Sequence, residues 1–524
     1  MPSANQTIRH IFDGGWATDF GSSAEVTAGP DGLIRIPFLT ESLNTFYELD
    51  GATHKIGGTL RMNTTAAGSG AEVIGLYDFW RGTGGGSGAQ KLVANYSTII
   101  GVANLDATSF TDTVTGLTDG QAMSYETFDD LLIISSYHST EGPWSYDQTT
   151  MGALAGTPPE FSFSATHKNR LWAAGVPATP SRLFYSTFVD PEDWTSKGSG
   201  FIDIDPGDGD QITAIASHKD DLWVFKGPYK GSIHRIVGSA PTGGDSFGRQ
   251  TFVRGLGAAS HNTLFRFRDD LGFMWSDGSI HSLNATAAFG DFNEAALSRP
   301  INGWLKDNIN GNRFEFYWAA TDSVRGYVLF TIATGTSTNN DHHLLMDYRF
   351  NPVRWSHWNA FTSGVVATVV DSGIPTLFDG SNDGFVRRLQ RSDRTVDATD
   401  AISCRTDTPC LNYGTPHNMK MIERASVGIL PKGAYDLTFG WTRDSNAEQT
   451  QTVGQGQTGS PLGTFVLDID RLGGSTFQNR FLSLEEGGEF RCLNFSVRNS
   501  GLSEDLEVHS IAATMRPGAD SGEN

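Results

Sequence analysis

In this 524-residue chain, the sequence pattern that most resembles a metal site is a cluster of carboxylates. Asp203, Asp205, Asp208 and Asp210 lie close together in the sequence, and Ca²⁺ is bound by carboxylate oxygens grouped in this way. The glycine and glutamate spacing of an EF-hand loop is absent. We therefore interpret the cluster as turns between strands, where Asp and Gly are common.

A second acidic run, Asp379–Gly384, also begins like a calcium loop. Its twelfth position is Gln390, where the loop requires a glutamate that binds through both carboxylate oxygens. The run is typical of a hairpin turn, and we interpret it as one.

Histidines could suggest a transition-metal site at Asp341, His342, His343 and His357. Adjacent side chains on a strand point to opposite faces, so His342 and His343 rarely share one ion. We interpret these residues as ordinary polar positions on strands, and we predict neither a metal nor a cofactor.

A glycosidase needs two carboxyl groups that flank the bond it cleaves, and Asp190, Glu192 and Asp193 lie beside Trp194. Pro191 and the loop context favour a structural turn, with Trp194 packed on a blade. A nucleophile elbow, a Walker loop and a zinc-protease helix are absent from the sequence. We therefore predict no catalytic residue and no enzyme activity.

Tryptophans offer a second way to bind sugars if their rings are exposed. The candidates are Trp80, Trp144, Trp355 and Trp358. We interpret most of them as core residues packed between blades, because large aromatic rings supply much of the buried area of a core.

Composition limits the classes of partner. The net charge of −21 is opposite to the basic surface that a protein needs to grip nucleic acid through its phosphates. The three cysteines are too few for a disulfide scaffold and suit a reducing cytoplasm. Cys404 and Cys410 could pair across a short loop, but we expect free thiols. The sequence shows no signal peptide and no apolar run long enough to span a membrane.

The elements that must position these residues are short strands in a repeated hairpin. The hairpin recurs with reference residues at Leu92, Leu131, Leu171, Leu222, Leu271, Val328 and Leu377. A β unit that repeats every 40–50 residues or so is the signature of a propeller blade. A single blade cannot bury both of its faces, so blades must stack into a ring.

We therefore predict an all-β fold. It comprises a β-propeller of six to eight blades, with seven the expected number, an N-terminal extension and a C-terminal β-sandwich-like domain in which buried and exposed residues alternate. The predicted boundaries are 1–72 for the extension and first strands, 73–394 for the propeller, 395–414 for a linker, 415–516 for the C-terminal β domain and 517–524 for a disordered tail.

Several passages carry a resemblance to a known family. Near the start they are Phe12–Gly15, Leu43–Asn44, Asp50–Gly51 and Lys55–Gly58. In the middle they are His167–Trp172, Pro180–Ser186, Asp190–Trp194, Gly207–Ile212, Asp220–Lys226 and Ser232–Ile236. In these motifs and their order, the chain resembles the tail nozzle or tail-hub proteins of short-tailed bacteriophages, which include the packaged-DNA stabilisation proteins. Residues 160–240 are the most specific part, and the match after about residue 285 is poor.

The resemblance implies a structural protein of the virion tail that is assembled in the host cytoplasm. It implies a homo-oligomeric ring, usually of six copies, next to head–tail adaptor or portal proteins and to tail fibre or tailspike proteins. The ring would retain packaged double-stranded DNA and then let it pass into the host without binding it tightly. An acidic channel would avoid sticking to DNA, which is our hypothesis for the charge of −21.

Two alternatives remain open. The chain could be a propeller that binds or cleaves carbohydrate, which would show glycan binding and, for a glycosidase, loss of activity on Glu192→Gln. It could also be a tail protein that binds the host receptor, which would adsorb to cells directly.

Overall fold

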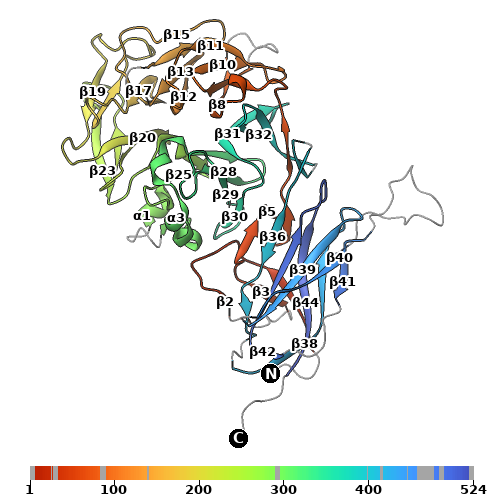
Figure 1. Cartoon of the computed structure of the whole chain (residues 1–524). Coiled ribbons are helices and arrows are strands. Elements are labelled where there is room, and N and C mark those ends of the chain that lie inside the picture. The colour runs from red at the N-terminus through yellow and green to blue at the C-terminus, as the bar shows by residue number, and fades with distance from the viewer. Residues whose placement is uncertain are drawn as a thin grey trace. The chain divides into compact units, whose positions relative to one another are not determined.

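The computed structural model describes residues 6–24, 26, 33–82, 90–137, 141–288, 295–392, 394–397, 399–413, 417–444, 446–456, 477–482 and 489–517. The chain is all-β and forms two compact units (Figure 1). We call them the propeller unit (Arg61–His343 and Thr362–Leu389) and the sandwich unit (Met1–Leu60, Leu344–Phe361 and Gln390–Asn524).

The propeller unit is a six-bladed arrangement in which each blade is a separate sheet of three or four strands. The first three sheets are β8–β11 (Val73–Trp80, Gln90–Tyr96, Ile99–Ala103, Thr111–Thr115), β12–β15 (Met123–Phe128, Leu131–Ser136, Trp144–Tyr146, Met151–Ala153) and β16–β19 (Phe163–His167, Arg170–Ala174, Arg182–Tyr185, Gly200–Asp203). The others are β20–β23 (Gln211–His218, Asp221–Gly227, Ser232–Val237, Gly248–Arg254), β24–β26 (Phe265–Phe267, Asp270–Met274, Ile280–Ser282) and β31–β33 with β7 (Ser363–Asp371, Ile374–Ser381, Val386–Arg391, Gly58–Arg61).

The repeated hairpin of the sequence corresponds to the blades. All seven reference residues lie in the second strand of a hairpin, namely β9, β13, β17, β21, β25, β28 and β32. Six of these strands belong to the six separate sheets, and the seventh belongs to the hairpin β27–β28 (Trp318–Asp322, Tyr327–Ile332), which packs against β24 and β31. The predicted propeller is confirmed with six blades, and the expected number of seven is reached only if this hairpin is counted.

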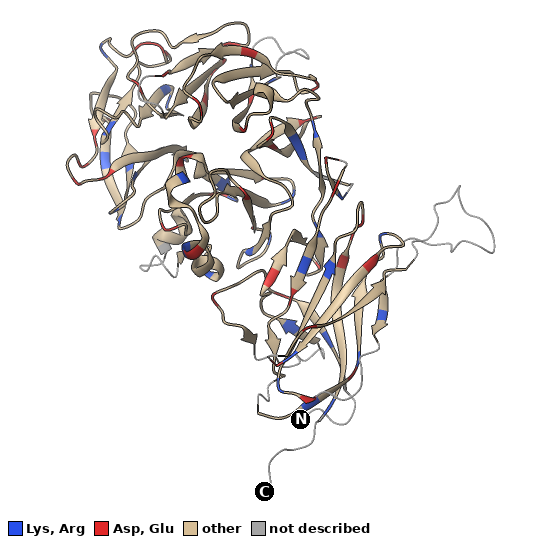
Figure 2. Ribbon diagram, in the orientation of Figure 1, with Lys and Arg blue, Asp and Glu red and all other residues tan. Residues whose placement is uncertain are grey.

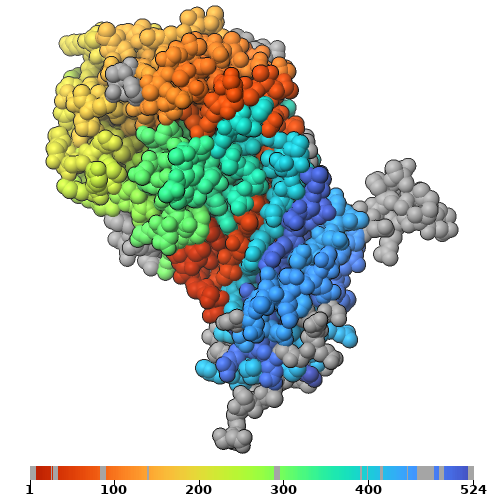
Figure 3. Space-filling view, viewed as in Figure 1, coloured from red at the N-terminus to blue at the C-terminus, as the bar shows by residue number. Residues whose placement is uncertain are grey.

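The ring closes where the propeller unit begins and ends. Strand β7 joins the sheet of β31–β33 as its fourth strand. The backbone N–H of Met62 donates to the carbonyl of Val386 at 2.7 Å, and the Asn63 side chain accepts from the N–H of Val386 and donates to the carbonyl of Gly384. Figure 3 shows the orange start of this unit against its cyan end.

Helices are few and short among the described residues. They are α1 (Leu283–Ala288), α3 (Asn302–Asn308) and the 3-10 turns η1 (Ala67–Ser69), η2 (His261–Thr263), η3 (Arg299–Ile301) and η4 (Gly311–Phe316). None of the described helices has the length and apolar character needed to cross a membrane.

The sandwich unit is built from both ends of the chain. One of its sheets has the order β3-β1-β44-β38-β41, with β42, β5 and β6 attached (Leu33–Ile36, Gln6–Phe12, Glu507–Pro517, Lys420–Ile429, Gln478–Leu482, Glu489–Phe490, Thr45–Tyr47, Thr53–Lys55). The other contains β2, β37, β43, β36, β4 and β30, with β39 and β40 (Ser23–Ala24, Cys410–Leu411, Leu493–Asn499, Cys404–Asp407, Glu41–Leu43, Arg354–Trp358, Asp436–Arg443, Gln449–Gly454). Ile8, Val427 and Ile511 of the first sheet share one core with Phe439 and Phe495 of the second.

Two of the predicted boundaries are therefore wrong. The opening 1–72 is not a separate extension, because β1 pairs with β44 in antiparallel register from Gln6 and Met515 to Ile11 and Ser510. The stretch 395–414 is not a linker, since it carries β34 (Thr395–Val396), β35 (Asp400–Ala401), β36 and β37. The predicted tail, 517–524, lies outside the described residues apart from Pro517, which ends β44.

The expectation of free thiols at Cys404 and Cys410 is wrong for Cys410 and is confirmed for Cys404. Cys410 and Cys492 form a disulfide whose Cα atoms are 5.4 Å apart. Cys404, which had been considered as a partner of Cys410, is a buried free thiol, and burial raises its pKa to about 11. The disulfide pair is separated by 82 residues in sequence, so spacing alone gave no sign of it.

Candidate functional site

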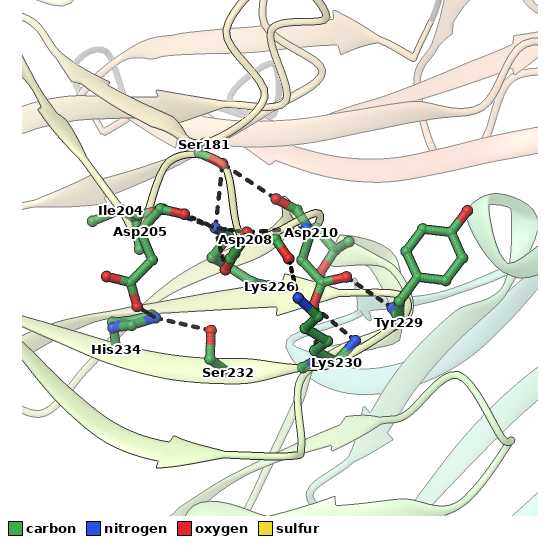
Figure 4. Close-up of polar contacts among 12 residues, drawn as sticks. Ser181, Ile204, Asp205, Asp208, Asp210, Lys226, Tyr229, Lys230, Ser232 and His234 are labelled. Atoms are coloured by element: carbon green, nitrogen blue, oxygen red, sulfur yellow. Dashed lines mark hydrogen bonds and ion pairs between the residues drawn. The ribbon is translucent and has the colours of Figure 1, made fainter.

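A buried ammonium group organises the boundary between the blades β16–β19 and β20–β23. Lys226, in β21, has a fully buried side chain. Its Nζ donates to both carboxylate oxygens of Asp208 at 2.8 Å, to the carbonyls of Ile204 and Asp205 at 2.8 and 3.0 Å, and to Ser181 Oγ at 3.2 Å (Figure 4). Burial of a charge is stabilising only when hydrogen bonds replace its hydration, and these five contacts do so.

Asp210 fixes the loop that follows β21. Its carboxylate accepts the backbone N–H groups of Tyr229 and Lys230 at 2.9 Å and of Gly231 at 2.8 Å (Figure 4). The Ser181 hydroxyl donates to the carbonyl of Asp210 at 3.2 Å. The loop is thus held by one buried carboxylate, and it presents a Tyr229 ring that is 80% exposed. We call Ser181, Asp208, Asp210, Lys226 and the 229–231 backbone the polar knot.

The other two carboxylates of this cluster also have partners within the chain. Asp203 pairs with Arg182 at 2.8 Å. Asp205 pairs with Arg249 and with Arg254, the latter at 3.0 Å. All four carboxylates therefore face ammonium, guanidinium or N–H groups, which leaves no oxygen-lined cage of the kind that Ca²⁺ prefers. Within the described ranges no group of three or more His, Cys, Asp and Glu residues could hold a metal.

The polar knot supports one wall of a cavity of about 400 Å³. Three residues that line the cavity are direct neighbours in sequence of residues of the polar knot. Pro180 precedes Ser181, Gln211 follows Asp210, and Pro228 precedes Tyr229. The lining also includes Tyr137, Phe163, Ser260, Phe314 and Glu315. The cavity thus lies where β16 and β20 begin.

The ionisable groups around this cavity are largely desolvated. Burial raises the pKa of the Glu315 carboxyl, and the nearby Arg313 guanidinium opposes that shift. His261 stacks on Phe163 with ring centroids 5.1 Å apart, and burial lowers its pKa to about 4. His261 is therefore neutral at pH 7.

The turn η2 separates this cavity from a second one of about 260 Å³. Ser260 lines the first cavity, whereas His261 and Asn262 line the second. Asn262 Nδ2 donates to the carbonyl of Met123 in β12 at 3.0 Å. Because η2 leads into β24, this bond ties the β24–β26 blade to a first strand elsewhere in the ring.

Aromatic rings also connect strands that lie far apart in the sequence. Tyr125 of β12 stacks on Tyr77 of β8 at 5.5 Å and lies 6.2 Å from Trp318 of β27. Gly75 leaves room for this packing, since a Cβ there would come within 2.4 Å of the Tyr125 hydroxyl. These contacts connect β8, β12 and β27.

The candidate glycosidase residues form a turn. The Asp190 carboxylate accepts the N–H of Glu192 at 2.9 Å, and that of Asp193 accepts the N–H groups of Thr195 and Ser196. The hydrogen bonds from Ser196 lower the pKa of Asp193, whereas a general acid needs a raised one. Trp194 packs near Phe161 with ring centroids 5.8 Å apart. The structure thus favours the predicted turn.

The candidate histidines do not converge on one point. His342 lies beside the Trp304 ring at 5.1 Å, His343 bonds Ser363 Oγ at 2.9 Å, and His357 bonds Glu41 in the sandwich unit. The Asp341 carboxylate accepts the N–H of Thr334 at 2.8 Å.

The run Asp379–Gly384 is a hairpin turn, as predicted. It joins β32 to β33, which pair in antiparallel register. The buried Asp379 carboxylate pairs with the Arg387 guanidinium, and the Ser381 N–H donates to the carbonyl of Phe385 at 2.7 Å. Asp379 therefore stabilises the blade.

Most of the candidate tryptophans are core residues, as predicted. Trp144, Trp355 and Trp358 are buried, and only Trp80 of these four is exposed, at 45%. Trp355 and Trp358 lie in β30 of the sandwich unit, so the blade-to-blade packing expected for them does not apply.

Sequence reasoning missed both Lys226 and the cavity. A lysine at the end of an apolar strand is usually interpreted as a solvent-exposed residue that ends the strand. No local sequence pattern indicates that the Asp208 carboxylate bonds the Lys226 ammonium group. One signal was available, because Ser181, Asp208, Asp210 and Lys226 all fall within the motifs that carry the family resemblance.

Comparisons with known proteins add little to this description. No family model matches the chain, and no curated protein matches it. Two crystal structures of BBS1N in complex with ARL6DN each align with 64% of this chain. The mercury-soaked one has a TM-score of 0.41 at 11% identity and is covered over 96% of its length. The lead-soaked one has a TM-score of 0.39 at 9% identity and is covered over 97%. A likeness this weak says nothing about function.

Proposed function

We propose that the chain is a structural protein of a bacteriophage tail, a nozzle or hub subunit that retains packaged DNA and then lets it pass. The observation that carries the proposal is the polar knot. Three motifs of the family resemblance, Pro180–Ser186, Gly207–Ile212 and Asp220–Lys226, supply Ser181, Asp208, Asp210 and Lys226 to one hydrogen-bonded cluster. The three motifs therefore meet in one cluster of the folded chain. This common structural role supports treating the family resemblance as more than chance.

In our proposal the DNA passes through the opening of a homo-oligomeric ring, between copies of the chain, and the ring contacts portal, adaptor and fibre proteins. This arrangement is the one that the family resemblance implies.

Charge supports passage without tight binding. The chain carries a net charge of −21, and acidic and basic residues are interspersed over both units (Figure 2). A surface of this kind lacks the concentrated positive charge that holds phosphates. We propose no enzymatic step, because the Asp190 and Asp193 carboxylates accept backbone N–H groups within a turn.

The proposal is tested by depletion and add-back. Phage particles assembled without this chain are expected to fill and then lose their DNA, and addition of the purified protein should restore nuclease-resistant DNA. Particles that keep their DNA and infectivity without the chain would contradict the proposal. Particles assembled without this chain also distinguish the nozzle proposal from the receptor-binding alternative. The alternative predicts that these particles keep their DNA and fail to adsorb to cells.

A further inference from the structure

The cavity beside the polar knot has the size and the wall chemistry of a small-ligand site. Its volume of about 400 Å³ falls in the range of roughly 300–1,000 Å³ that is typical of ligand pockets. Tyr137, Phe163 and Phe314 contribute aromatic rings, and Pro180 and Pro228 contribute flat apolar faces. Such faces pack against the C–H groups of a ring-shaped ligand.

The polar groups of the wall are mainly hydroxyls and amides. Ser162, Thr213 and Ser260 supply hydroxyls, and Gln211 and Asn312 supply amides. Ser260 is only 2% exposed, and its hydroxyl lies beside the Tyr137 hydroxyl, where it opposes the burial that raises the Tyr137 pKa. Each of these two hydroxyls can both donate and accept, so a ligand that also does both can bond with them.

The charge of the wall argues against an ionic ligand. Glu315 is the ionisable carboxyl of the lining, and Arg313 lies close enough to offset it. Neither an anion nor a cation would find an unopposed counter-charge there. Groups that donate and accept hydrogen bonds, set between flat apolar faces, match the alternating hydroxyl and C–H surface of a sugar.

We propose that this cavity binds a neutral mono- or disaccharide. The polar knot positions the site, because it fixes Pro180, Gln211 and Pro228 through their chain neighbours Ser181, Asp210 and Tyr229. The site does not depend on the proposed nozzle function.

Saturation-transfer NMR on the full chain tests the proposal. The probes are D-glucose, D-galactose, N-acetyl-D-glucosamine and lactose, with tetramethylammonium as the cationic probe and inorganic phosphate as the anionic probe. At least one sugar should bind in the millimolar range and should not be displaced by either ion. The proposal is overturned if no sugar binds, or if either ion displaces a bound sugar.

Two variants locate the site. Gln211 is exposed at the start of β20, so Gln211→Trp should fold and should weaken sugar binding at least tenfold by filling the mouth. Gln250→Trp makes the same change at an exposed position of β23, away from the cavity, and should bind like the parent. Equal binding by Gln211→Trp and Gln250→Trp, with unchanged melting curves, would contradict the assignment.

Discussion

At the scale of single residues, hydrogen bonds within the polar knot replace the water molecules that its buried charged groups would otherwise bind. Lys226 Nζ has five oxygen contacts, and the Asp210 carboxylate holds three consecutive N–H groups. A carboxylate that accepts several backbone N–H bonds keeps its charge in a buried position. These residues therefore stabilise the loop and the cavity wall.

Asp210→Asn tests the importance of that charge. The amide retains one acceptor oxygen but turns an N–H₂ group toward backbone donors, so we expect a loss of about 2 kcal/mol in the stability of the propeller unit. Urea denaturation followed by tryptophan fluorescence measures it. Asp203→Asn is the matched control, because Asp203 is half-exposed and pairs with one surface arginine, and it should cost less than about 1 kcal/mol. Equal losses in the two variants would show that the knot has no special role.

His54 of the sandwich unit gives a prediction about pH. Burial alone would lower its pKa, but hydrogen bonds to Asp505 and Glu48 outweigh burial and raise the pKa above the usual 6.5. A raised pKa in the folded state adds stability that is fully present below pH 6.5 and is lost as the pH rises through the folded-state value. The thermal transition of the sandwich unit should therefore shift downward between about pH 6.5 and the folded-state pKa.

The variant His54→Gln isolates this contribution. It removes the titrating ring, so the transition should lose its downward trend in that window. His218→Gln is the control, because His218 lies in the propeller unit and its pKa is lowered. An unchanged trend in His54→Gln would exclude His54 as the source.

At the scale of elements, the sequence predicts local hairpins well and long-range partners poorly. The repeated Leu positions mark second strands, because strand and turn signals act over only a few residues. Alternation predicts one shared face for Tyr435, Leu437, Phe439 and Trp441; the last three are buried together, whereas Tyr435 precedes β39 and is half-buried. The pairing of β1 with β44 leaves no local signature, because the two strands are almost a chain length apart. The strands of 395–414 span only two to four residues each, which is too short for a visible period.

The disulfide gives a prediction at the same scale. Cys410 lies in β37, and Cys492 lies next to β43, which pairs with β37. Closing a loop of this length restricts the unfolded chain and typically adds about 2–4 kcal/mol. Dithiothreitol should therefore lower the melting temperature of the parent chain.

The control is the variant Cys492→Ser, which should melt at the lower temperature and should not respond to dithiothreitol. A parent chain that is also indifferent to reduction would show that the disulfide adds no stability.

At the scale of the whole molecule, the net charge of −21 governs behaviour toward DNA. At about 150 mM salt, a protein without clustered basic residues gains little from counterion release. Gel retardation with micromolar protein should leave double-stranded DNA unshifted, alongside a basic DNA-binding protein that shifts it. Retention of DNA by this chain would contradict passage without binding.

The central claim is the location of the chain in the virion, and immunogold electron microscopy tests it most directly. Antibody against this chain is applied to phage particles from a culture that produces it, both intact and after opening. We predict gold at the tail or the neck of the particles. Absence of gold from intact and opened particles alike would contradict the account.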